Sequence, residues 1–374
     1  MTSAFANLSD KAAERLWLRP MGPFAGTAAA AAAERGLALP LAGSDLAFSL
    51  IELLARGTDG ITQVVATLAE LQAWSAERGG AVADRVAAQL AALTGARPSW
   101  AGLSFARPLL MGIVNVTPDS FSDGGDFREH HRAIAQARAL LEEGADIIDV
   151  GGESTRPGAV PVSVEEEWRR VEPVIRALAD AGAVLSIDTR HARVMAAALA
   201  AGARIVNDVS ALTGEPESIR IVARSRAPVV LMHMQNDPRT MQRAPSYTLA
   251  SLDIAEYLED RIAACVAGGI APDRIVVDPG IGFGKRADHN LEIIERLSLL
   301  HALGRPVLLG LSRKGIVGGS DNTLQPKERL PGSLAGALAG VAQGVQILRV
   351  HDIAETRQAV GIWRAATARR DAME

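Results

Sequence analysis

The chain has 374 residues, of which 48% are hydrophobic and 22% charged, and its formal net charge at pH 7 is −4. This length exceeds one average domain but suits an α/β barrel of about 250 residues with a smaller second unit. The small net charge argues against a protein that binds nucleic acid. A single cysteine, Cys265, excludes a disulfide framework, and the run around it is typical of the apolar face of a helix.

The sequence shows no sign of export or membrane insertion. The N-terminus lacks a basic stretch followed by an apolar run, and no window approaches the roughly 20 apolar residues that a membrane-spanning helix needs. We therefore expect a cytoplasmic protein that makes no use of a membrane.

Residues 1–104 predict a small α+β extension whose role the sequence does not reveal. The run ERLWLRPMG (14–22) predicts a strand, and GTAAAAAAERG (26–36) and VADRVAAQLAALTG (82–95) predict helices. DLAFSLIELLARG (45–57) fits either a strand or a helix. Prolines and turn residues around position 104 mark the boundary with a second domain over 105–374.

From residue 108 onward, short apolar runs alternate with amphipathic stretches, which indicates repeated βα units and a parallel sheet. There are eight such runs, beginning at Pro108, Asp146, Val184, Arg204, Pro228, Arg274, Pro306 and Gln346. Eight units favour closure into a (β/α)₈ TIM barrel. An open doubly wound sheet would carry a G-x-G-x-x-G loop in its first turn, whereas this turn reads NVTPDSFSDGG (115–125).

Polar residues stand at or just after the end of nearly every predicted strand. They are Asn115, Glu153, Ser154, Thr155, Arg156, Asp188, Asn207, Asp208, His233, Asp278, Ser312, Arg313, Lys314, Arg349 and His351. Any one of them could simply cap a helix or brace a loop. Together at the carboxyl ends of barrel strands, where such barrels build their active sites, they predict a polar pocket.

The residue types indicate which ligands this pocket would accept. Asp188 and Asp278 suit a heterocycle that donates several N–H groups, and Asn207 can both donate and accept. Lys314, Arg349 and His351 suit an anion, while the Asn115 amide oxygen suits a hard cation such as Mg²⁺.

Other common chemistries find no support in the sequence. No Ser–His–Asp order, cysteine nucleophile or zinc-ligand spacing is visible. GIGFGKR (280–286) departs from a phosphate-binding loop because Pro279 stands where its first glycine belongs.

Eight motifs resemble the dihydropteroate synthase family. They are MGIVNVTPDSFSDGG (111–125), GADIIDVGGESTRPGA (144–159), SIDT (186–189), IVNDVSA (205–211), LMHMQ (231–235), VVDPGIGFGK (276–285), GLSRKGIVG (310–318) and RVHD (349–352). The resemblance runs from about residue 108 to about 360. It implies an enzyme of folate biosynthesis, the target of sulfonamides, that joins (7,8-dihydropterin-6-yl)methyl diphosphate to p-aminobenzoate to give 7,8-dihydropteroate and diphosphate.

The resemblance also implies roles for single residues. The pterin would be held by Asp188, Asn207, Asp278 and Lys314 between the apolar walls Met232 and Phe283. Arg349 and His351, with Arg156, would face the phosphates, and Asn115 would ligate Mg²⁺. Thr155 and Ser312 would lie near p-aminobenzoate, under a lid over residues 117–126 that carries Phe121. Of these, Asp188, Asp278, Lys314, Arg349 and His351 would carry the catalysis, in a homodimer formed through the later barrel helices.

Two alternative functions remain open at this point. A pterin-binding methyltransferase could use the same barrel, although it would need no diphosphate site. A non-catalytic paralogue could use the barrel as a scaffold, although all proposed ligands are intact. For the extension, we expect a packing or dimer-supporting module, and a regulatory or partner-binding role is the alternative.

Overall fold

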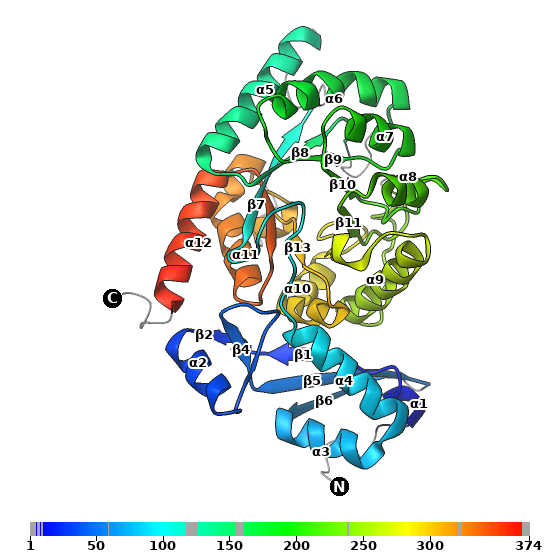
Figure 1. The fold of residues 1–374 in the computed structure, drawn as a ribbon, viewed down its shortest axis with the longest axis vertical. Coiled ribbons are helices and arrows are strands. Elements are labelled where there is room, and N and C mark those ends of the chain that lie inside the picture. Colours follow the sequence, from blue (N-terminus) through cyan, green and yellow to red (C-terminus); the bar gives the residue numbers. More distant parts are fainter. Residues whose placement is uncertain are drawn as a thin grey trace.

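A computed structural model describes residues 5, 8, 10–58, 60–116, 126–154, 161–237, 239–319 and 324–368. The chain forms a barrel with a smaller unit beside it, and the blue extension lies below the barrel in Figure 1. Among the described residues, no helix is long and apolar enough to cross a membrane.

The barrel confirms the predicted fold class, since all eight expected runs are strands. Its strands are β7 Leu109–Asn115, β8 Ile147–Gly151, β9 Leu185–Asp188, β10 Ile205–Asp208, β11 Val229–Met232, β12 Ile275–Asp278, β13 Leu308–Leu309 and β14 Ile347–Val350. They pair in parallel in the order β12-β11-β10-β9-β8-β7-β14-β13. A parallel bridge between Val277 and Val307 joins β12 to the segment leading into β13 and closes the ring.

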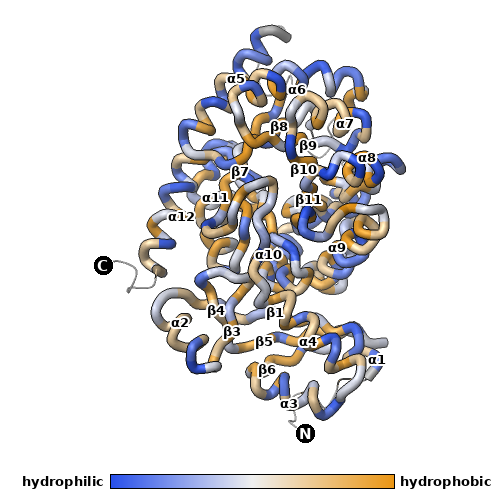
Figure 2. The backbone as a smooth tube through the Cα atoms, in the orientation of Figure 1, coloured by the Kyte–Doolittle hydropathy of each residue, from blue (hydrophilic) through white to orange (hydrophobic). Residues whose placement is uncertain are grey.

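Helices follow the strands and cover the outside of the barrel. They are α5 Asp126–Glu143, α6 Val164–Ala179, α7 Ala192–Ala200, α8 Ser218–Ser225, α9 Ala250–Ala267, α10 Ala287–Glu295, α11 Leu330–Val341 and α12 Ile353–Thr367, with short 3₁₀ helices η3 Pro272–Arg274, η4 Leu297–Leu303, η5 Gly315–Gly318 and η6 Pro326–Arg329. In Figure 2 strands β7 and β8 are mostly orange, whereas helices such as α5 and α12 alternate between orange and blue, as expected for helices that cover an apolar barrel with one face. Cys265 is buried in α9, as expected for a core residue.

The extension contains two antiparallel sheets with helices beside them. One sheet has the order β1-β5-β6 and the other β2-β4-β3. The elements are α1 Asp10–Ala13, β1 Trp17–Met21, β2 Phe24–Ala25, α2 Gly26–Glu34, β3 Leu39–Pro40, β4 Leu46–Phe48, β5 Leu50–Gly57, β6 Gly60–Thr67, α3 Leu68–Arg78 and α4 Gly80–Thr94. The ambiguous run over 45–57 is therefore two strands, and the expected helices and first strand are present.

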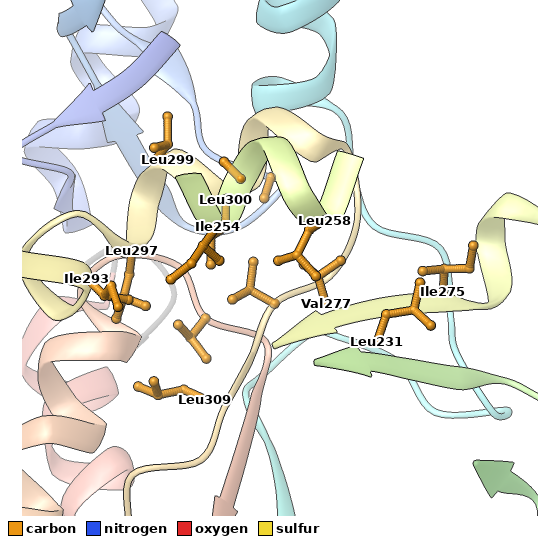
Figure 3. Packing of buried hydrophobic residues seen from close by; sticks show 14 of the residues in the cluster. Leu231, Ile254, Leu258, Ile275, Val277, Ile293, Leu297, Leu299, Leu300 and Leu309 are labelled. Atoms are coloured by element: carbon orange, nitrogen blue, oxygen red, sulfur yellow. The ribbon is translucent and has the colours of Figure 1, made fainter. Parts of the chain in front are cut away.

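The extension packs against the barrel through buried ionic and apolar contacts. Glu52 on β5 accepts from Arg19 Nε at 2.5 Å and from Arg296 Nη1, on the barrel side, at 2.7 Å. The Ser298 hydroxyl in η4 donates to the carbonyl of Pro20 at 2.7 Å. Figure 3 shows the leucines of η4 beside those of α9 and the barrel strands, so η4 lies between the two units.

Inside the barrel, the lower layer of side chains is apolar. Because strand residues alternate between faces, the inward positions near the strand starts form one cluster, made of Leu109, Met111, Ile147, Ile205, Val230, Val276, Leu308 and Ile347. Trp100, from the segment that follows the extension, belongs to the same cluster, and its indole N–H donates to the carbonyl of Arg274 at 2.8 Å. The lower end of the barrel is thus filled, and any ligand must enter from the carboxyl ends of the strands.

Candidate active site

Above the apolar layer, the inward positions of the strands become polar. Asp188 ends β9 and pairs in register with Asn207 of β10, while Asp278 ends β12 and pairs with Met232 of β11. Asn207 and Asp278 are each 5% exposed and Met232 is 4% exposed. The expected pterin-side residues therefore gather on one face of the sheet, at the open end of the barrel.

Arg349 binds two carboxylates in this layer. Its Nη2 donates to Asp188 Oδ2 at 2.7 Å, and its Nε donates to Asp149 Oδ2 at 2.6 Å. The same Asp149 oxygen accepts from Asn207 Nδ2 at 3.0 Å. Sequence reasoning missed Asp149 because it considered only strand ends, and this aspartate lies in the middle of β8.

Burial shapes the electrostatics of this group. Desolvation raises the pKa of Asp188 to about 7, against the opposing effect of Arg349 and with the help of the negative charge on Asp149. Burial alone would lower the pKa of Arg349, but the two carboxylates outweigh it and raise that pKa. The arginine stays charged, and Asp188 sits close to its titration point at neutral pH.

Asp278 and Lys314 are two further buried charged groups at the rim, and each shifts the pKa of the other. Desolvation raises the pKa of Asp278, although Lys314 and a 2.7 Å hydrogen bond from the Gly280 N–H oppose the rise. Burial lowers the pKa of Lys314 to about 8, and Asp278 limits the fall. The ammonium donates to the carbonyl of Ile281 and lies 4.5 Å from the ring centroid of Phe283. The ring of Phe283 therefore packs against the Lys314 ammonium.

The loop that carries Phe283 is shaped by a buried lysine. Lys285 Nζ donates to the carbonyls of Gly280 at 2.8 Å, Phe283 at 2.9 Å and His233 at 3.2 Å. Gly280 has φ +67°, and a Cβ there would lie 2.0 Å from the His233 oxygen, so only glycine fits. The glycine-rich motif over 280–286 thus builds a tight turn held by its own lysine.

His233 stands at a strand end but serves this loop. Its Nδ1 lies 3.0 Å from Lys285 Nζ. Burial, followed by the charge of Lys285, lowers the pKa of His233 well below its usual value, so the ring is neutral.

Ser312 and His351, which follow β13 and β14, meet at the rim. The Ser312 hydroxyl accepts from the backbone N–H of His351 at 3.2 Å and lies 3.1 Å from His351 Nδ1. If the hydroxyl donates its proton to Nδ1, the neutral ring carries its own proton on Nε2. Arg313, also noted at this strand end, is instead bound to Asp352.

Asn115 ends β7 beside Gly151 of β8. A Cβ at Gly151 would lie 3.6 Å from Asn115 Oδ1, so the missing side chain leaves space next to this oxygen.

Glu153, which follows β8, is bound to Arg190 by two hydrogen bonds, at 2.8 and 2.9 Å. The remaining candidates, Thr155, Arg156 and Phe121, and the rest of the expected lid over 117–125, lie outside the described residues.

Comparisons with known proteins show which family the chain resembles. The sequence profile of the family described as "Pterin binding enzyme" matches residues 111–351. The chain is 48% identical over 264 residues to the dihydropteroate synthase of Neisseria meningitidis serogroup B, which covers 69% of this chain and 93% of the relative. With the Escherichia coli K12 enzyme the identity is 44% over 270 residues, 72% of this chain and 95% of the relative.

The chain belongs to the dihydropteroate synthase family. Its activity is that of a dihydropteroate synthase, a transferase of folate biosynthesis. Solved structures agree: the Xanthomonas albilineans dihydropteroate synthase with 4-aminobenzoic acid has a TM-score of 0.68 and 47% identity, covering 72% of this chain and 97% of that one. The Yersinia pestis enzyme in complex with a sulfonamide drug has a TM-score of 0.67 and 45% identity, covering 71% and 96%. The family profile leaves the extension unmatched.

Proposed function

We propose that the polar layer holds the pterin and that its cationic part holds the diphosphate. One observation carries this assignment: acceptors and cations adjoin at the same barrel end. Asp188, Asn207 and Asp278 offer acceptors to the N–H groups of a pterin, and Lys314 completes this group with a cation. Met232 and Phe283 supply apolar surface on either side.

The phosphates would lie toward Arg349 and His351, with Arg156 as a further cation. The guanidinium of Arg349 is a donor suited to phosphate oxygens, and Nε2 of His351 is another when Ser312 donates its proton to Nδ1. Thr155 and Ser312 would lie near p-aminobenzoate, and Phe121 would cover its ring when the 117–126 segment closes. The dihydropteroate synthases of X. albilineans with 4-aminobenzoic acid and with 7,8-dihydropteroate support these substrate classes.

A magnesium ion shared with the substrate fits the residues present. No group of three or more His, Cys, Asp or Glu able to hold a metal occurs among the described residues. Mg²⁺ commonly takes only one or two protein oxygens and completes its shell with phosphates and water. Asn115 would hold the ion, which would supply positive charge opposite the diphosphate.

The reaction then needs stabilisation of two charges more than it needs a strong base. The C–O bond to diphosphate breaks with its electron pair going to the leaving oxygen, and the pterin methylene becomes a cation delocalised into the ring. The arylamine nitrogen attacks this carbon and later loses a proton to solvent. Asp188 and Asp278 offset the ring cation, while Arg349 and His351 offset the diphosphate. Such preorganised groups contribute about 3–4 kcal/mol each.

The assay for this proposal is amine-dependent diphosphate release. Purified protein, hydroxymethyl-dihydropterin diphosphate, p-aminobenzoate and Mg²⁺ should release diphosphate only when the amine is present. Asp278→Ala should abolish the release because it removes the pterin anchor. Diphosphate release at the wild-type rate from a folded Asp278→Ala variant would contradict the assignment of Asp278 as a pterin-binding residue.

For the extension, residues 1–104, the role that fits best is a packing module for the barrel. Its support is the buried contact of Glu52 with Arg296, the ion pairs of Arg56 with residues of α9, and a 3.0 Å pair between Arg85 and Glu259. Deleting 1–104 should lower thermal stability more than turnover per folded molecule. A deletion variant that is as stable as the full chain would contradict this role.

The enzyme would act as a homodimer through its later barrel helices. Ile362 on α12 and Leu291 on α10 are exposed apolar side chains on these helices, and the dimer would cover them. Sedimentation equilibrium of the full chain should give twice the chain mass of 39.3 kDa. A monomer at micromolar concentration would contradict it. The expected cytoplasmic location stays a prediction.

A further inference from the structure

We infer that Asp149 is a positioning residue that fixes which hydrogen-bonding end of Asn207 meets the pterin and holds the plane of Arg349. The inference rests on the proposed function, because it assumes that the pterin occupies the polar layer. Asp149 lies in the middle of β8, and the sequence motifs gave it no role. The inference gives it a role in ligand selection.

Asp149 occupies the centre of the polar layer. It is fully buried, and its Oδ2 accepts from both Arg349 Nε and Asn207 Nδ2. These partners come from β14 and β10, each separated from β8 by one intervening strand in the sheet. The carboxylate therefore links side chains that the backbone ladder does not bring together, across the inside of the barrel.

The contact with Asn207 has a direct consequence for ligand choice. Asn207 Nδ2 donates to Asp149 Oδ2, so the nitrogen end of the amide faces Asp149. The amide oxygen is then the end left for a ligand. With Asp188 on the adjacent strand and Asp278 two strands away, the pocket presents acceptors, which favours a ring edge with adjacent N–H donors over one that carries carbonyl oxygens.

The contact with Arg349 fixes a second side chain. The guanidinium is planar, and it is bound at Nε by Asp149 and at Nη2 by Asp188. Two carboxylates, one on Nε and one on Nη2, hold the orientation of this plane. Removing the Asp149 carboxylate frees Nε, while the bond from Nη2 to Asp188 remains.

One carboxylate oxygen of Asp149 has no hydrogen-bond partner among the described residues. Oδ1 is buried and has no hydrogen-bond partner, whereas Oδ2 has two. A buried acceptor without a donor is costly, and such atoms in native proteins commonly mark a functional demand. The carboxylate is thus retained at a cost to the fold, as expected if its charge and orientation serve the ligand.

The decisive experiment compares two ligands in two variants. The probes are 6-hydroxymethylpterin and 6-hydroxymethyllumazine, which carries a carbonyl oxygen on C2 in place of the 2-amino group. Calorimetry with wild-type protein should show strong preference for the pterin. In Asp149→Asn, which keeps the side-chain volume, Asn207 is free to turn, and we expect the preference to fall at least tenfold. Kinetically, KM for the pterin diphosphate should rise while KM for p-aminobenzoate stays within twofold.

Ser186→Ala is the matched control. Ser186 pairs in register with Asp149 on the adjacent strand, is buried, and makes no side-chain hydrogen bond. It should keep the wild-type preference, and circular dichroism should show that both variants are folded. An unchanged preference in folded Asp149→Asn, or an equal loss in Ser186→Ala, would overturn the inference. Failure of the proposed function would look different, because wild-type protein would then bind no pterin and release no diphosphate.

Discussion

Replacing Asp278 with asparagine separates the contribution of its charge from that of its shape. The carboxylate is buried at the end of β12, where it would accept a hydrogen bond from the pterin. A hydrogen bond to a charged group is worth roughly 1.5–3 kcal/mol, and stabilisation of the developing cation roughly 3–4 kcal/mol. At about 1.4 kcal/mol per decade, we expect kcat/KM to fall by about 10³-fold or more.

The same change should leave the fold intact or strengthen it. Folding raises the pKa of Asp278, so its ionised form destabilises the native state at neutral pH. Asp278→Asn removes that charge, and we expect a melting temperature equal to or above that of the wild type. The assay is amine-dependent diphosphate release, run beside thermal melting. A loss of kcat/KM below threefold, or a loss explained by unfolding, would refute the reasoning.

Three further outcomes follow from the structure. Raising the pH through about 7 ionises Asp188 and should improve pterin binding, whereas raising it past about 8 removes the charge of Lys314. We therefore expect kcat/KM for the pterin substrate to peak between these two pH values. A flat profile from pH 6 to 9 would contradict this expectation. Asn115→Ala should raise the Mg²⁺ concentration needed for half-maximal rate, measured by titration at saturating substrates, and an unchanged requirement would contradict the metal assignment. Glu52→Ala leaves Arg19 and Arg296 buried without a counter-charge. It should lower the free energy of unfolding, measured by denaturant titration, by about 3–5 kcal/mol and leave kcat at 25 °C unchanged. A loss below 1 kcal/mol would contradict this role of Glu52.

The barrel was predictable because its signals are local and repeated. Each strand is a short apolar run, and each helix that follows carries an apolar stripe. In the extension, residues 60–78 received no prediction, although β6 and α3 occupy them. Thr67 and Glu70 form a capping box at the start of α3, and this T-x-x-E pattern was available in the sequence.

The candidate site was predictable at strand ends and not within strands. Asp188 and Asp278 stand last in their strands, where barrel sites are expected. Asp149 was detectable from alternation, since it shares its face with Ile147 and Gly151 and is the charged residue among them. Its partners Asn207 and Arg349 lie 58 and 200 residues away, and only the closed barrel brings them together.

Asp208 and Lys285 are polar residues that look like site residues in the sequence but whose side chains serve the fold. Asp208 follows Asn207 directly but points to the other face, where it accepts from backbone N–H groups of the next turn. Lys285 lies in a glycine-rich motif that is superficially similar to a phosphate-binding loop. Its Nζ donates to the carbonyls of Gly280 and Phe283 in its own turn. Residue type and position suggest a site in both cases, and the direction of the side chain decides against it.

The central claim, that the pterin lies in the polar layer of the barrel, is tested most directly by a crystal structure of this chain with 7,8-dihydropteroate. We expect the pterin ring within hydrogen-bond distance of Asp188, Asn207 and Asp278, with its face against Phe283. A pterin bound anywhere else on the molecule, with these side chains unchanged, would contradict the account.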